Sequence, residues 1–260
     1  MNFVEALESL LPVIDNVYED WAKERDMMLS QHQARLEGPQ ITCTKGCGAC
    51  CYFPLIPATA GEAFVLLARL LAEGHTTEQL HQQFMPYARK YLESAKKQNS
   101  LPMTDSQQRL FLKEKLPCPL FISTPETGPL GGHCSVFPFR PQICDFFHSV
   151  DSPELCVLKK PHGSFSDISE QGLKSIEDIR MAERKIFGRS ALGHLPLLVA
   201  ALLTEDGLQT FLTVVEPDGS IENSQDIEDF GLYVSLLSCL GYSWGEGDWS
   251  SLAKAQDEVL

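Results

Sequence analysis

The sequence lacks any apolar stretch long enough to cross a membrane. Its longest uninterrupted apolar run, residues 195–203, has nine residues and includes Pro196, whereas a membrane-spanning helix needs about 20. No basic segment followed by an apolar core stands at the start of the chain, so no secretory signal is predicted. We therefore expect a cytoplasmic protein that does not associate with membranes.

Basic residues are also scarce. The chain has 21 Lys and Arg against 35 Asp and Glu, for a net charge of −14, which argues against binding to nucleic-acid phosphates or an anionic lipid surface. Residues 204–260 contain twelve acidic residues and a single basic one, Lys254. This region is interpreted as a solvated acidic surface, with a docking face for a basic protein partner as the alternative.

Several common catalytic motifs are missing. The chain has no H-E-x-x-H, no P-loop, no G-x-S-x-G and no G-x-G-x-x-G, so it has no signature of a zinc protease, a nucleotide-phosphate loop, a serine hydrolase or a dinucleotide fold. Whether the protein is an enzyme is left open by the sequence.

Cysteine is the residue that the chain has in excess. Nine cysteines without a signal peptide, odd in number and including the adjacent pair Cys50–Cys51, indicate metal ligands or reactive thiols rather than disulfides. Seven of them lie in two loop-rich segments. The first segment has the spacing C-x3-C-x2-C-C, and the full set is Cys43, Cys47, Cys50, Cys51, Cys118, Cys134 and Cys144.

An all-thiolate set favours zinc or an iron–sulfur cluster over magnesium or calcium. Two tetrahedral ions that share one thiolate would use all seven cysteines, whereas a [4Fe–4S] cluster would use four, and both counts are feasible. Cys156 is weighed as an eighth ligand, although a plain thiol is favoured there. His133 and His148 stand near the proposed ligands and are weighed as further ligands. Cys239 lies in an apolar helical segment and is predicted to be a core residue.

Helical patterns flank the cysteine segments. Apolar residues spaced three and four apart predict a helix over residues 2–37, ended by Gly38-Pro39. Capping boxes at residues 59–62 and 76–79 predict two more helices. The remaining expectations are helices over 104–115, 176–187, 197–203 and 226–240, and a strand and turn over 211–219 forming one arm of a small β-hairpin.

These patterns predict a mainly α protein whose helices pack around an irregular, loop-rich, cysteine-ligated metal centre. We expect a single compact domain over residues 1–260. Its parts are an N-terminal helix (1–40), a cysteine-cluster region (41–165) and a C-terminal helical region (166–260).

The cysteine segments contain four sub-motifs in order: C-x3-C-x2-C-C, then Cys118-Pro119-Leu120, then Cys134-x-Val136-Phe137, then Arg140-Pro141-x-x-Cys144. This order resembles the zinc- or iron-chelating cysteine-cluster family, whose domain is called CxxCxxCC and has also been labelled flagellin N-methylase-like. The match covers about 100 residues. The resemblance implies that the seven cysteines bind the metal and that the protein is bacterial and cytoplasmic. Asp145 departs from the pattern, because an arginine commonly follows the last cysteine.

Three functions are weighed. The first is a metal-binding protein whose cysteine centre holds the fold together, with electron-transfer or metal-handling use. The second is an iron–sulfur enzyme that uses S-adenosylmethionine, such as a protein lysine N-methylase. Against it, Ala49 stands where the radical enzymes usually have an aromatic residue before the third cysteine. The third is a metal-stabilised interaction or regulatory module.

Overall fold

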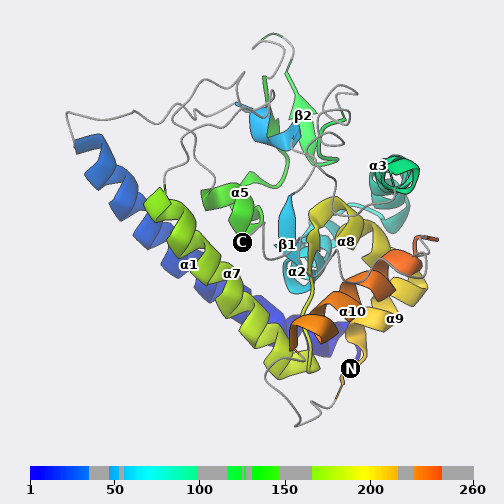
Figure 1. The fold of residues 1–260 in the computed structure, drawn as a ribbon. Helices are drawn as coiled ribbons and strands as arrows, with labels where there is room; N and C mark the ends of the chain where they lie inside the picture. Colours follow the sequence, from blue (N-terminus) through cyan, green and yellow to red (C-terminus); the bar gives the residue numbers. More distant parts are fainter. Residues whose placement is uncertain are drawn as a thin grey trace.

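The structure is a computed structural model that describes residues 1–34, 47–52, 56–98, 116–124, 126, 131–146, 166–215 and 225–241. This described part is mainly helical, as predicted, with eight α-helices and two two-stranded sheets (Figure 1). The helix predicted over residues 104–115 lies outside it. No single described helix is long and apolar enough to cross a membrane, and only α8 and α9 together, bent by 101°, pass that test.

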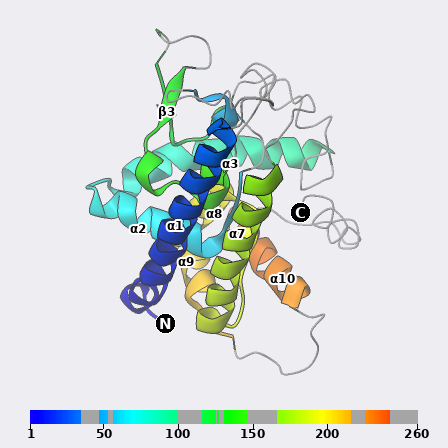
Figure 2. The same ribbon diagram turned by 90° about the vertical axis from the view of Figure 1, so that its left-hand side faces the viewer.

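Two long helices lie side by side, α1 (Phe3–Ala34) and α7 (Ser166–Phe187). They run in opposite directions along one side of the molecule (Figures 1 and 2). The apolar stripe predicted on α1 is confirmed, since Leu10, Ile14 and Trp21 are buried. Trp21 packs against Ile176 of α7 in a small apolar cluster of its own.

At the centre of the fold, two short strands pair with each other, and each leads directly into a helix. Strand β1 (Pro57–Thr59) leads into α2 (Ala60–Ala72), and β4 (Leu192–His194) leads into α8 (Leu195–Leu202). The strands are antiparallel, with Pro57 opposite His194. Every residue of α8 is buried, as expected of a helix that is hydrophobic on all sides.

Both predicted capping boxes form. The Glu62 N–H donates to Thr59 Oγ1 (3.1 Å) and the Thr59 N–H donates to Glu62 Oε2 (2.9 Å). Thr76 and Gln79 make the same reciprocal pair at the start of α3 (Thr77–Gln98), which packs on α8. Because each box satisfies two N–H groups that the first turn leaves free, these helix starts were predictable from four residues each.

The strand predicted over residues 211–215 is wrong. Phe211 and Leu212 belong to α9 (Glu205–Leu212), which begins at the N-cap Thr204, whose hydroxyl accepts from the Gly207 N–H (3.0 Å). Phe211 is buried between the rings of Phe64 and Phe187. A cap and two acidic residues in the first turn favour the helix, and tertiary burial of the Phe211 ring outweighs the β-propensity of residues 211–215. Helix α10 (Gln225–Ser238) follows close to the prediction.

A buried histidine links the β1–β4 pair to α3. The Nδ1 atom of His194 accepts from the Ile56 N–H (3.0 Å), and Nε2 lies 2.9 Å from the Tyr87 hydroxyl. Since Nδ1 accepts a hydrogen bond, the neutral ring carries its hydrogen on Nε2 and donates a hydrogen bond to the Tyr87 hydroxyl. Burial lowers the pKa of His194 from 6.5 to about 3.

We expect this histidine to make the fold sensitive to acid. An unfolded chain protonates His194 near pH 6.5, whereas the folded chain resists protonation down to about pH 3, so its contribution to stability is lost as the pH falls through that window. The loss is about 5 kcal/mol over the whole window, and about 3 kcal/mol of it has occurred by pH 4. Glu183, whose pKa burial raises to about 7, changes stability in the opposite sense, so the measured quantity is a difference between variants.

The measurement is the free energy of unfolding in denaturant between pH 7 and pH 4. The variant His194→Gln keeps an acceptor for Ile56 but does not titrate, so it should lose less stability on acidification than the wild type. His75→Gln, at an exposed position, should behave as the wild type does. An equal acid sensitivity in all three proteins would contradict the assignment.

Candidate metal centre

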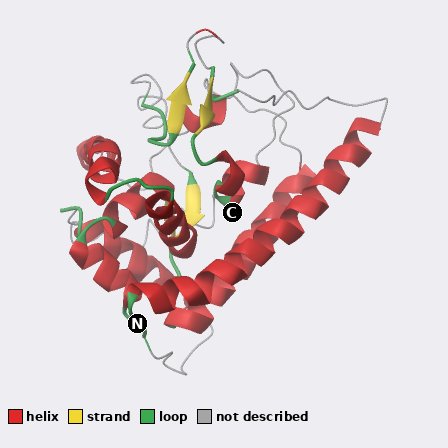
Figure 3. Cartoon of the chain, turned by 180° about the vertical axis from the view of Figure 1, so that it is seen from behind, coloured by secondary structure: helices red, strands yellow, loops and turns green. Residues whose placement is uncertain are grey.

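The described cysteines of the two loop segments come together at one end of the molecule. Cys50 and Cys51 lie in η1 (Ala49–Tyr52), and Cys134 ends β3 (Gly132–Cys134), which pairs with β2 (Phe121–Ser123). Figure 3 shows this strand pair at the edge of the fold, away from the β1–β4 pair among the helices. Cys144 lies in the short helix α5 (Gln142–Phe146).

Backbone hydrogen bonds join these segments to one another. The Cys118 N–H donates to the Cys51 carbonyl (2.6 Å), and Cys47 forms an isolated antiparallel bridge with Gly131. In β2 and β3, Phe121 stands opposite Cys134. Residues separated by some 70 positions in the sequence therefore share one small hydrogen-bonded framework.

Two adjacent glycines, Gly131 and Gly132, lead into Cys134 as part of the strand framework. Gly131 bridges to Cys47, and Gly132 is the first residue of β3. A side chain at Gly132 would collide with the Ile122 carbonyl and the Phe121 ring. The glycine is required by this close cross-strand approach, which brings Cys134 to the same region as Cys118.

Burial and mutual repulsion shape the acidity of the thiols. Burial raises the pKa of Cys118 to about 12 and that of Cys144 well above its ordinary value, and neighbouring thiols add to both shifts. Cys50 differs, because a hydrogen bond from the Cys51 thiol and the charge of Arg140 lower its pKa to about 7. The pKa of Cys51 rises in turn.

These interactions also report proximity. The Cys144 thiol interacts electrostatically with the thiols of Cys50, Cys118 and Cys134, and the Cys51 thiol interacts with three of the same group. The five thiols that the fold places within reach of one another are Cys50, Cys51, Cys118, Cys134 and Cys144. They come from four separate stretches of the chain, as the predicted ligand set requires.

The other predicted or weighed ligands are described only in part. The backbone of Cys47 is joined to this region by its bridge to Gly131. His133 is exposed on β3, where neighbouring side chains point to opposite faces, so it faces away from Cys134. Cys239 follows α10, is only half-buried and donates to the Ser235 carbonyl (3.3 Å), so the predicted core position is only partly correct. Three weighed residues lie outside the described part: Cys43, His148 and Cys156.

The donor set fits a thiophilic metal by its chemistry. None of the described cysteines is in a disulfide, and the five gathered side chains are all thiols. Among the described residues, no three Cys, His, Asp or Glu side chains already have positions that could hold a metal ion, so binding would require the thiols to move together. Buried thiols ionise readily only beside a cation, and a metal ion supplies that charge.

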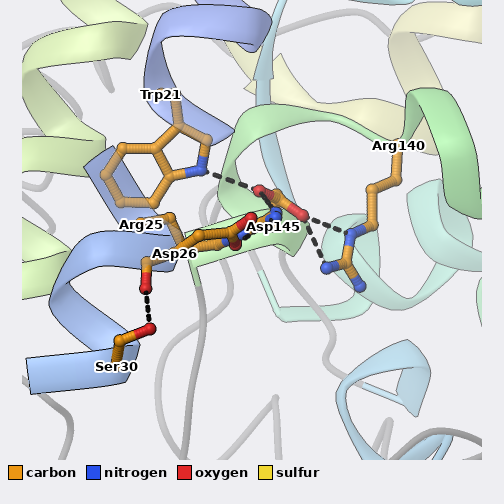
Figure 4. Close-up of polar contacts among 6 residues, drawn as sticks. All are labelled: Trp21, Arg25, Asp26, Ser30, Arg140 and Asp145. Carbon is orange, nitrogen blue, oxygen red and sulfur yellow. Dashed lines mark hydrogen bonds and ion pairs between the residues drawn. The ribbon is translucent and has the colours of Figure 1, made fainter. Parts of the chain in front are cut away.

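A partly buried ion-pair network centres on Asp145, which directly follows Cys144 in the chain (Figure 4). Asp145 Oδ1 accepts from Arg140 Nε (2.9 Å) and Nη2 (2.6 Å), while Oδ2 accepts from Trp21 Nε1 (2.7 Å) and from Arg25. Burial alone would raise the pKa of Asp145, but the charges and hydrogen bonds of these neighbours outweigh it and the pKa is lowered. From the sequence alone, Asp145 stood out only as a departure from the arginine of the resembling family's pattern.

A second polar residue that the sequence analysis did not connect to the site is Glu62. Beyond its capping role, its Oε1 atom accepts from the Gln142 N–H at the start of α5 (2.8 Å) and from the Tyr18 hydroxyl of α1 (2.8 Å). Burial raises the pKa of Glu62 despite these donors. The capping box was the only available signal, and it could not indicate a partner 80 residues away.

Comparisons with known proteins do not extend this description. A scan against protein-family models, a search of curated proteins and a search of solved structures each return no match. The resemblance to the cysteine-cluster family therefore stays a prediction from the spacing of its motifs.

Proposed function

We propose that the protein binds a metal centre, either zinc or an iron–sulfur cluster, through Cys43, Cys47, Cys50, Cys51, Cys118, Cys134 and Cys144. The observation that carries the proposal is the gathering of five of these thiols from four stretches of the chain. Cysteines that served only in core packing would not be expected to cluster, since a buried cysteine ordinarily packs as a small hydrophobic residue.

The composition of the group supports a closed, soft-metal site. Catalytic zinc normally keeps one open position and uses histidine or carboxylate ligands, whereas the gathered groups are thiols. A cation in their midst would also offset the repulsion between neighbouring thiolates, which otherwise raises their pKa values after burial. Both zinc and iron–sulfur chemistry agree with this ligand type.

The alternatives receive no support from the described residues. The radical S-adenosylmethionine enzymes use repeated strand–helix units, but both described sheets are two-stranded and antiparallel. The interaction-module reading depends on the acidic region 204–260, and nothing in its described residues identifies a basic partner. The protein is therefore proposed as a metal-binding protein without an assigned reaction.

The first test is elemental analysis with a visible absorption spectrum on protein purified without oxygen. We expect at least one zinc or iron per chain. A brown solution with a band near ~400 nm, together with iron and acid-labile sulfide, would identify an iron–sulfur cluster. A colourless protein with zinc would identify a closed structural site. Metal-free, folded protein that takes up neither zinc nor iron would contradict the proposal.

A further inference from the structure

The helix that carries Cys144 is too short to hold its own position. Helix α5 has five residues, and isolated helices shorter than about 12 residues are marginal in water. Its orientation, and hence that of the Cys144 thiol, must come from contacts with other elements. Helix α5 packs mainly on α7, and three further sets of contacts lead to α1.

The first route to α1 is Asp145, which follows Cys144 directly. Its side chain is 16% exposed and joins Trp21 and Arg25 of α1 to Arg140 on the other side (Figure 4). Trp21 and Arg25 are one helical turn apart, so both reach the same carboxylate from one face of α1. Charge-assisted hydrogen bonds that are partly buried, as these are, are stronger than solvent-exposed ones.

The other two routes flank it on the same short helix. The Gln142 N–H donates to Glu62, which also accepts from the Tyr18 hydroxyl of α1. Ile143 packs against the Trp21–Ile176 cluster between α1 and α7. Residues 142, 143 and 145 therefore contact the α1 side, while the Cys144 thiol interacts with the other thiols.

Arg140 connects the same carboxylate to the cysteine group. Its guanidinium donates twice to Asp145 Oδ1, lies over the Phe137 ring at 4.2 Å, and interacts electrostatically with the thiols of Cys50, Cys134 and Cys144. Asp145 thus determines where this charge stands beside the thiols. Without the carboxylate, Arg140 would lose this ion-pair partner, and Arg25 would keep only its exposed pair with Asp26.

We infer that Asp145 is a positioning residue that couples the cysteine centre to the α1–α7 helix pair. It orients Cys144 and Arg140 for metal binding, and metal binding in turn tightens the docking of α1 on α5. The inference rests on the proposed metal-binding function. Because linkage is reciprocal, each event must favour the other by the same factor.

The test compares Asp145→Asn with a matched control, Asp15→Asn. Asp15 of α1 pairs with Arg69 of α2, so this control also removes a carboxylate that tethers α1, but away from α5. The affinity of metal-free, reduced protein for Zn²⁺ is measured by competition with a chromophoric chelator. We expect Asp145→Asn to weaken binding by about 10- to 100-fold, the usual effect of losing an outer-shell partner, and Asp15→Asn to stay near the wild type.

Hydrogen exchange supplies a readout that loss of stability alone would not move. In the wild type and in Asp15→Asn, saturating Zn²⁺ should slow amide exchange in residues 14–30 of α1 as well as in the cysteine segments. In Asp145→Asn at saturating Zn²⁺, the cysteine segments should still be protected while the slowing in α1 is lost. Trp21→Phe, which removes only the indole N–H donor, gives the same direction if Asp145→Asn fails to fold.

The outcomes separate the two proposals. Normal Zn²⁺ binding with equal affinities for both aspartate variants, or with no Zn²⁺-dependent change in α1, overturns the coupling and leaves the proposed function standing. A wild-type chain that binds no Zn²⁺ and no iron–sulfur cluster overturns the proposed function, and the coupling with it. Weakened binding in Trp21→Phe, a residue outside the thiol group, supports the coupling directly.

Discussion

Replacing Cys118 by serine is expected to strip the protein of its metal and to destabilise it by at least about 3 kcal/mol, because the binding energy of a structural metal is also folding energy. Cys118 is the most buried of the gathered cysteines, at 6% exposure, and its N–H donates a hydrogen bond to the Cys51 carbonyl. Metal per chain and the thermal unfolding midpoint measure the two effects. Cys47→Ser should act in the same direction.

The matched control is Cys239→Ser. This thiol is half-buried after α10 and contacts Ser235 and Thr210 instead of the other cysteines, so its replacement should leave the metal content unchanged. A second comparison separates metal from packing, since Cys118→Ser and wild type should differ much less after metal removal. If Cys118→Ser keeps full metal and the wild-type midpoint, the constellation has been misinterpreted.

Replacing Glu62 by alanine is expected to cost about 3–5 kcal/mol, since it would leave several buried donors without an acceptor. The Glu62 carboxylate accepts hydrogen bonds from the Thr59 and Gln142 N–H groups and from the Tyr18 hydroxyl. Glu62 is only 2% exposed. These donors belong to the N-cap of α2, to α5 and to α1, so the loss weakens the junction of three elements at once. The free energy of unfolding in urea measures the effect.

Two variants calibrate this result. Glu62→Gln keeps one oxygen acceptor and should cost clearly less than Glu62→Ala. Glu78→Ala removes an acidic residue from the first turn of α3, where the side chain is exposed, and should change stability by less than about 1 kcal/mol. A cost for Glu62→Ala no larger than for Glu78→Ala would show that the junction is not stabilised by this carboxylate.

The helix starts were accessible to sequence reasoning because their causes are local. Thr59 with Glu62, and Thr76 with Gln79, satisfy neighbouring N–H groups within one turn. The stripe on α1 was accessible for the same reason, as helical periodicity alone places Leu10 and Ile14 on one face. The strand predicted at residues 211–215 failed because the partners of Phe211, Phe64 and Phe187, are distant in sequence.

In the candidate site, too, local features were predictable from the sequence and long-range contacts were not. The spacing of the seven cysteines predicted a shared centre, and five of them are brought within reach of one another. The spacing carried no information about Asp145, since Trp21 and Arg25 approach it from more than 100 residues away. Nor did the spacing indicate that Glu62 accepts a hydrogen bond from the first residue of α5.

By itself, the sequence determined the mainly helical class, the capped starts of α2 and α3, and the choice of thiols as the candidate ligands. Each of these follows from residue types and from interactions within a few positions along the chain. Only the tertiary structure decided which thiols meet, which histidine is buried and kept neutral, and which carboxylates brace α5. Those outcomes depend on burial and on long-range partners, which raise or lower the energy of a polar group by its surroundings and not by its sequence neighbours.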